Sequence, residues 1–121
     1  MLNDTYNFSK VYIACGYTNL RYGIDGLSAI VKNEYNLDPF EKNVLFLFCG
    51  RRLDRIKGLL WEGDGFLLLY KRLEGSKFQW PRSSEEVALL KPEQYTWLMQ
   101  GLSIYQKRLI RELDHKPQLT A

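Results

Sequence analysis

The chain has 121 residues, which is a length typical of a single domain. Hydrophobic residues make up 45% of it, including 3 Trp, 8 Tyr and 6 Phe, so it can bury one core and intrinsic disorder is excluded. The formal net charge of +3 is only mildly basic, and this total alone does not indicate a nucleic-acid partner.

The first nine residues are mostly polar, and residues 1–9 are expected to form a flexible N-terminus. They lack the basic segment followed by an apolar core that marks a signal peptide. No apolar run in the chain approaches the length that spans a membrane. The sequence therefore predicts a cytoplasmic protein without a membrane partner.

Residues 10–16 are rich in β-branched and aromatic side chains and end at glycine, which predicts a strand. After a loop, Asp25 is predicted to cap a helix over about residues 25–35. Pro39 stops the helical pattern, because proline disfavours the α conformation in the residue before it. Five apolar side chains fall near helical spacing and are expected on one buried face: Ile24, Leu27, Ile30, Val31 and Tyr35.

The most strand-like part of the sequence follows. Residues 44–49 form a continuous apolar run, which predicts a central strand buried on both faces. Residues 55–62, 66–73 and 77–80 are predicted as three further strands, separated by short glycine-containing turns. Because strands joined by such short turns are antiparallel neighbours, the segment is predicted to be a β-meander.

The pattern of residues 85–90 is ambiguous, and helices are predicted over about residues 92–101 and 104–113. The predicted fold class is therefore α+β, with an antiparallel β-meander of about four to five strands. This meander is expected to pack against the N-terminal helix and the C-terminal helices. Residues 10–102 are expected to form the single domain, and residues 103–121 a C-terminal helix and tail.

Cysteine and histidine usage argues against a metal site. Cys15 and Cys49 each lie in an apolar run, no Cys-x-x-Cys spacing occurs, and His115 is the only histidine. A zinc site is therefore not predicted. Both thiols are expected to act as small core hydrophobes in a reducing compartment.

No catalytic arrangement is predicted. Asp54, Glu62 and Asp64 lie at strand ends or in a turn, where such side chains bond to nearby backbone, whereas a metal-dependent nuclease needs carboxylates that converge on a metal pair. Gly63 and Gly65 join two strands and do not open a helix, so they do not form a phosphate loop. No nucleophile lies beside a base, so neither an enzyme nor a cofactor is expected, and a nuclease is the third alternative.

The positive charge is local. Residues 51–82 contain eight Lys or Arg against four Asp or Glu, whereas the rest of the chain contains nine against ten. In a meander, the start of the strand at Arg55 and the end of the strand at Leu73 share one end of the sheet, so the charges gather where they can follow a phosphate backbone. Alternatively, they protect a sheet edge from aggregation. The candidate nucleic-acid-binding residues are Arg51, Arg52, Arg55, Lys57, Lys71, Arg72, Lys77 and Trp80.

Four aromatic residues lie among these charges, namely Trp61, Tyr70, Phe78 and Trp80. On the surface of a basic sheet, such side chains stack on nucleic-acid bases. The alternative is that they form half of the core between the sheet and a helix. Trp80, beside Pro81 at the end of the meander, is the one expected to be exposed.

Several multi-residue blocks, in order along about residues 10–102, resemble one family. Together they resemble the TnpB (second open reading frame) accessory proteins of insertion sequences of family sixty-six, which are unrelated to the RNA-guided nuclease TnpB. The blocks are Val11–Gly16, Thr18, Leu20-Arg21, Gly23, Asp25–Leu27, Leu37–Phe40, Val44–Phe48, Arg51-Arg52, Asp54–Lys57, Trp61–Phe66, Tyr70–Glu74 and Phe78–Pro81.

The resemblance implies a non-catalytic accessory protein of bacterial transposition, encoded beside a separate transposase that carries the acidic catalytic residues. It supplies no site residues. Lys91 stands where family members often have a hydroxyl residue that caps the helix, and the tail beyond Leu102 also departs from the pattern.

Two functional hypotheses follow from the residues and the resemblance together. The first is contact with transposon-end DNA through the basic face of the meander. The alternative is an adaptor that recruits or regulates the transposase through the C-terminal helix or a sheet edge. The sequence leaves the oligomeric state open.

Overall fold

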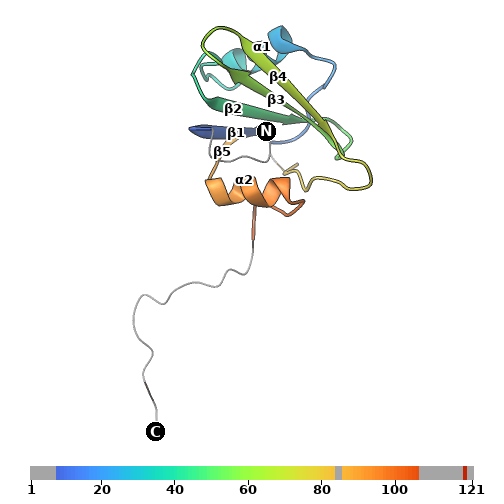
Figure 1. Ribbon diagram of the computed structural model, residues 1–121. Coiled ribbons are helices and arrows are strands. Elements are labelled where there is room, and N and C mark those ends of the chain that lie inside the picture. The colour runs from blue at the N-terminus through green and yellow to red at the C-terminus, as the bar shows by residue number, and fades with distance from the viewer. Residues whose placement is uncertain (1–7, 84–85, 107–118, 120–121) are drawn as a thin grey trace.

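The computed structural model describes residues 8–83, 86–106 and 119 (Figure 1). Within these residues the chain forms an α+β fold, which confirms the predicted class. The elements in chain order are β1 (Lys10–Ala14), α1 (Ile24–Asn33), β2 (Val44–Cys49), β3 (Arg55–Trp61), β4 (Phe66–Arg72), β5 (Val87–Leu90) and α2 (Pro92–Met99).

The strands form one sheet in the order β4-β3-β2-β1-β5. The predicted antiparallel pairing of β2, β3 and β4 is confirmed, since Leu47 lies opposite Gly58 and Gly58 lies opposite Leu69. The prediction of an entirely antiparallel meander is wrong, because β1 and β2 are parallel. The physical reason is the helical connection: α1 carries the chain back along the sheet, so β2 starts at the same end as β1.

The predicted strand over residues 77–80 is also wrong, and the ambiguous residues 85–90 instead contain the last strand. Val87–Leu90 pairs antiparallel with β1. Residues 77–80 are irregular and cross one face of the sheet. The backbone N–H of Phe78 donates to the carbonyl of Leu53 at 2.7 Å, and the indole N–H of Trp80 donates to the carbonyl of Ala14 at 2.8 Å. These contacts tie the segment to loop and strand ends and not to a neighbouring strand.

The two helices cover opposite faces of the sheet, so the fold has three layers (Figure 1). All six residues of β2 are buried, as the sequence predicts for a central strand. Side chains alternate along the strands, so β1, β2, β3 and β4 each contribute to both cores, whereas β5 contributes only to the core on the α2 face. The core on the α1 face contains Leu27 and Val31 of the helix with Phe46 and Leu59 of the sheet.

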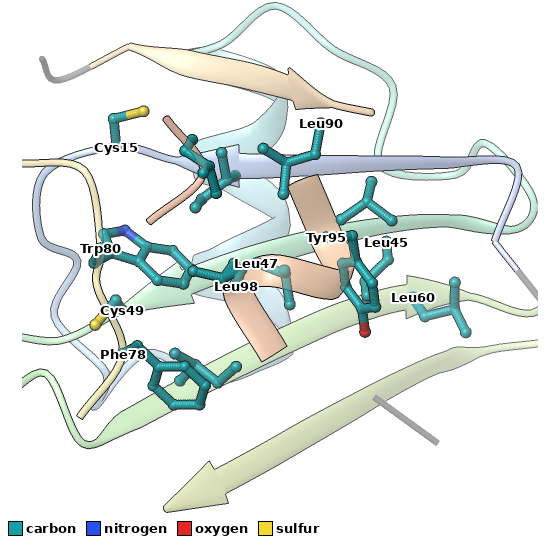
Figure 2. Close-up of a cluster of buried hydrophobic side chains, with 14 residues drawn as sticks. Cys15, Leu45, Leu47, Cys49, Leu60, Phe78, Trp80, Leu90, Tyr95 and Leu98 are labelled. Atoms are coloured by element: carbon teal, nitrogen blue, oxygen red, sulfur yellow. The ribbon is translucent and has the colours of Figure 1, made fainter. Parts of the chain in front are cut away.

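The core on the α2 face is larger and includes the irregular segment (Figure 2). In Figure 2, Phe78 and Trp80 belong to the same cluster as Leu47 of β2 and Leu98 of α2. Tyr95 and Leu98 of α2 are 1% and 0% exposed. Phe8, just before β1, packs edge-to-face against Tyr95 at a ring-centroid distance of 6.1 Å.

The helix boundaries differ slightly from the predicted ones. The N-cap of α1 is Gly23, and Asp25 lies in the first helical turn, where a carboxylate stabilises the helix dipole. In α2, the backbone N–H of Lys91 donates to the side-chain oxygen of Gln94 at 2.9 Å, which compensates for the missing hydroxyl cap. Gly101, with φ of 82°, ends this helix.

The predicted helix over 104–113 lies mostly outside the described residues. Residues 104–106, which are described, are not helical. Ile104 is buried in the core on the α2 face.

Both cysteines are buried and unpaired, which confirms that they are core residues. Burial raises the pKa of the Cys49 thiol to about 11, and it raises the pKa of Cys15 as well. Because the thiolate is the reactive form, burial lowers the reactivity of both thiols at neutral pH.

Candidate nucleic-acid interface

The candidate basic residues are positioned by one end of the sheet. Arg55 at the start of β3 lies directly opposite Arg72 at the end of β4, as the sequence predicts. Opposed residues share a face, so Arg55, Lys57, Tyr70 and Arg72 lie on the α1 face. Lys71, one residue along, lies on the α2 face. The predicted set is therefore divided between two faces.

The loop after β1 reaches the same end of the sheet. Parallel strands place their carboxyl ends at one edge, so the segment that leaves β1 lies beside the segment that leaves β2. The backbone N–H of Thr18 donates to the carbonyl of Cys49 at 2.8 Å and joins the two segments. Two loops distant in the sequence thus meet beside the start of β3.

A hollow of about 820 Å³ opens between these loops, and we call it the arginine–tyrosine hollow. Four of its lining residues are arginines, two are tyrosines, and no Asp or Glu lines it. The complete lining is Tyr17, Thr18, Asn19, Leu20, Arg21, Gly50, Arg51, Arg52, Arg55 and Tyr70.

Arg82 connects the two loops that form the hollow. Its guanidinium donates to the carbonyls of Gly16 and Gly50 at 2.6 Å each, and to the carbonyl of Arg51 at 3.2 Å. A guanidinium presents several donors in a fixed fork, so one side chain holds both backbones. Arg82 is therefore a positioning residue for the hollow.

Replacing Arg82 with alanine is expected to lower the free energy of unfolding by about 1–2 kcal/mol, because three backbone carbonyls lose a charged donor. Arg82→Lys is expected to recover only part of this loss, because an ammonium lacks the planar fork. Urea unfolding measures the stability, and amide hydrogen exchange of residues 16–21 and 49–52 measures the order of the loops. Unchanged exchange in both loops after Arg82→Ala would show that Arg82 does not position them.

Arg51 is held in place by Tyr17. Its guanidinium lies 4.7 Å from the centroid of the tyrosine ring and donates to the tyrosine hydroxyl at 3.0 Å. Such cation–π contacts stabilise a surface arginine and restrict its conformations. Arg51 therefore lines the hollow in an ordered position.

Asp54 partly neutralises the arginines that surround it. It contacts Arg55 at 3.0 Å and Arg52 at 3.5 Å. The hydrogen bond from Arg55 lowers the pKa of Asp54, and the same contact raises the pKa of Arg55. The Arg52 side chain is 74% exposed, so most of it remains accessible to a ligand.

The other candidate residues lie outside the hollow. Lys57 donates to the backbone carbonyl of Tyr22 at 3.0 Å and fixes the loop before α1. Arg72 is exposed and pairs with Glu74 at 2.8 Å. Lys77 is exposed at the edge of a smaller hollow on the α2 face, together with Phe78 and residues that follow α2.

The prediction that Trp80 is exposed is wrong. Its side chain is 5% exposed, and its indole N–H is bonded to the backbone of β1. It packs in the core because the irregular segment crosses the sheet face under α2. Trp80 is therefore almost entirely buried, whereas Tyr70 is 52% exposed and lines the hollow.

Seven residues that line the hollow were not among the candidate nucleic-acid-binding residues: Tyr17, Thr18, Asn19, Leu20, Arg21, Gly50 and Tyr70. The side chain of Asn19 accepts a hydrogen bond from the backbone N–H of Arg21 at 3.0 Å, a turn that asparagine forms readily. The residue types could predict this turn, but they could not predict that the turn lies beside Gly50. That position depends on the parallel pairing of β1 with β2.

The hollow offers hydrogen-bond donors and positive charge. Arginine and tyrosine donors suit phosphate oxygens. Within residues 8–83, 86–106 and 119, no three His, Cys, Asp or Glu side chains gather where a metal ion is held. Neither of the described helices is long and apolar enough to cross a membrane.

The fold and the hollow define a small three-layer α+β domain with a basic surface formed by loops at one sheet end. The family model described as IS66 Orf2 like protein matches residues 9–109. The chain belongs to this family, which is an accessory family of IS66 insertion-sequence transposition and not a known catalytic family.

Two relatives come from Sinorhizobium fredii (strain NBRC 101917 / NGR234). The uncharacterized protein y4hO is 33% identical over 93 residues, which cover 77% of this chain and 80% of that protein. The uncharacterized protein y4jC is 31% identical over 93 residues, which cover 77% of this chain and 79% of that protein. No solved structure matches the chain significantly.

Proposed function

We propose that this protein is a non-catalytic accessory protein of IS66 transposition that binds transposon DNA through the arginine–tyrosine hollow and acts with the separately encoded transposase. The observation that carries the proposal is the convergence of four arginines and two tyrosines on one hollow without an Asp or Glu in its lining. The family membership supplies the setting, because transposition acts on DNA.

The hollow suits the phosphate backbone better than it suits base edges. Arginine forks match the geometry of phosphate oxygens, and tyrosine hydroxyls donate to the same atoms. The loops that carry these groups are held by Arg82 and by the Thr18–Cys49 backbone hydrogen bond. Because they are already ordered, little conformational entropy is lost on binding. Sequence-tolerant binding follows, since phosphate contacts position a protein on DNA without reading its sequence.

The accessible charge of the hollow determines the expected salt dependence. Arg55 is paired with Asp54, which leaves mainly Arg21, Arg51 and Arg52 to replace counterions. With about 0.9 counterions released for each phosphate contact, the logarithm of the binding constant is expected to fall with the logarithm of salt with a slope of about −2.7.

The test is fluorescence anisotropy of a labelled duplex carrying the end of the insertion sequence, titrated with the full chain from about 50 to 200 mM salt. Binding with a slope near the expected value supports the proposal. Absence of binding at the lowest salt, or binding that does not depend on salt, overturns it. A duplex of unrelated sequence is the matched control, and it is expected to bind with an affinity within a few-fold.

A further inference from the structure

The outer strand β4 has an unprotected apolar edge. It is seven residues long, its first five residues are Phe66-Leu67-Leu68-Leu69-Tyr70, and none of its residues is fully buried. In the described part of the chain, no strand pairs with its outer side. The opposite edge strand, β5, has only four residues and is followed by Lys91-Pro92. Short strands, lysine and proline protect sheet edges, and β4 lacks these features until Lys71.

The hydrogen-bond pattern identifies which backbone groups of β4 face outward. The backbone N–H of Glu62 donates to the carbonyl of Gly65 at 2.9 Å, and the backbone N–H of Leu73 donates to the carbonyl of Asp54 at 2.6 Å. These residues therefore form hydrogen-bonded pairs that continue the β3–β4 ladder. Such pairs alternate along an antiparallel ladder, so the odd-numbered residues of β4 bond to β3. The backbone N–H and C=O groups of Phe66, Leu68 and Tyr70 therefore point away from the sheet.

The residues along this edge are complementary to themselves around Leu68. At equal distances on either side stand Asp64 and Arg72, then Phe66 and Tyr70, then Leu67 and Leu69. Phe66 and Tyr70 belong to the strand and lie on the same face, whereas Asp64 lies in the turn immediately before the strand. Asp64 is exposed, and the Arg72 side chain is 54% exposed. The edge thus carries opposite charges and matching aromatic residues in mirror order.

We propose that β4 pairs antiparallel with β4 of a second copy of this chain, about a twofold axis at Leu68, to form one continuous sheet. This register places Phe66 opposite Tyr70 of the second copy, and cross-strand pairs of this kind stabilise antiparallel ladders. It also brings Asp64, in the turn before the strand, to the end of the ladder beside Arg72 of the second copy. A register centred on Leu69 places Phe66 opposite Arg72 and brings the turn of Asp64 toward that of Glu74, which is a contact of like charges. A register centred on Leu67 separates the aromatic pair.

The pairing has a consequence for the two hollows. A twofold axis perpendicular to the sheet keeps the α1 faces of both copies on the same side. Tyr70, which lines the hollow, is then displaced by four residues from Tyr70 of the second copy, which is about 13 Å measured along the strands. One duplex contacts both hollows if the proposed DNA binding is correct. The pairing itself does not rest on that proposal.

The test is the oligomeric state of the full chain without DNA, measured by sedimentation velocity over a concentration series. Asp64→Lys and Arg72→Glu are each expected to raise the dissociation constant of the dimer about tenfold, because each dimer contains two such pairs. The double variant, with the charges exchanged, is expected to return to within about threefold of the unaltered chain. This rescue identifies the pair, since a general loss of stability is not restored by a second reversal.

Leu68→Pro provides a second measurement. Proline at this position removes an N–H that points outward and leaves the β3–β4 ladder intact, so a folded monomer is expected, with its strand content checked by circular dichroism. A monomer for the unaltered chain at all concentrations overturns the proposal. A dimer that none of the variants weakens also overturns it and assigns self-association to another surface. Loss of DNA binding in a chain that still dimerises contradicts only the proposed function.

Discussion

Replacing Arg51, Arg52 and Arg55 together with alanine is expected to reduce the affinity for duplex DNA at least about a hundredfold at low salt. Hydrogen bonds to charged groups contribute about 1.5–3 kcal/mol each, so the loss of two phosphate contacts is sufficient for this effect. The substitution also leaves the Asp54 carboxylate without its two arginine partners beside the bound phosphates. The slope of binding against salt is expected to become shallower by about two. Anisotropy titrations measure both quantities.

The matched control removes the same charge from other surfaces. Lys32, Lys77 and Lys91 are exposed and do not line the hollow, so their combined replacement with alanine is expected to change the affinity only about threefold. Both triple variants have the same net charge. An equal loss of affinity in the two variants would assign binding to net charge and contradict a specific role for the hollow.

Replacing Trp80 with alanine is expected to lower the free energy of unfolding by about 3–5 kcal/mol, because a large buried side chain leaves a cavity. Trp80 packs in the core on the α2 face, and its indole donates to the carbonyl of Ala14, so that carbonyl also loses a partner. Guanidinium unfolding of the variant and the unaltered chain measures the difference. A loss below about 1 kcal/mol would contradict the packing of residues 77–80 against the sheet.

Trp80 and Tyr70 form an informative contrast. Trp80→Phe keeps an aromatic ring in the core and removes the indole donor, so it is expected to leave the DNA affinity unchanged. Tyr70 is half exposed and lines the hollow, so Tyr70→Ala is expected to weaken DNA binding while changing stability by less than about 0.5 kcal/mol. If Trp80→Phe weakened DNA binding and Tyr70→Ala did not, Trp80 would be the aromatic side chain that contacts DNA, which would contradict its burial.

Most of the strands could be predicted because their signals are local. The apolar run of β2 indicates burial on both faces, and a short turn with glycine forces β3 and β4 to be antiparallel neighbours. Gly63, with φ of 96°, occupies the first central position of that turn. The parallel pairing of β1 with β2 could not be predicted in this way, because it depends on the path of α1 across the sheet.

Residues 77–80 show where a correct pattern led to a wrong element. Phe78 and Trp80 are buried while Lys77 and Gln79 are exposed, so the side chains alternate as in a strand although Trp80 was expected at the surface. Alternation alone does not require a neighbouring strand, and here the backbone bonds to loop and strand ends instead. The prediction was therefore wrong both on the strand and on the exposure of Trp80.

The same topological error explains the incomplete prediction of the site. Arg51, Arg52 and Arg55 are close in sequence and follow one strand end, so their proximity could be predicted. Tyr17 and Arg21 join them only because β1 lies parallel beside β2, which places both following loops at one end. A meander without this pairing gives no reason to place the two loops together.

The most direct test of the hollow as the DNA surface is to map backbone amide NMR shifts of the full chain on addition of insertion-sequence-end duplex. If the hollow binds DNA, the largest changes are expected at residues 17–21 and 50–55, with little change in α2. The changes are expected to disappear at high salt. Changes concentrated on α2 and the α2 face, with residues 17–21 and 50–55 unaffected, would contradict the assignment of DNA binding to the arginine–tyrosine hollow.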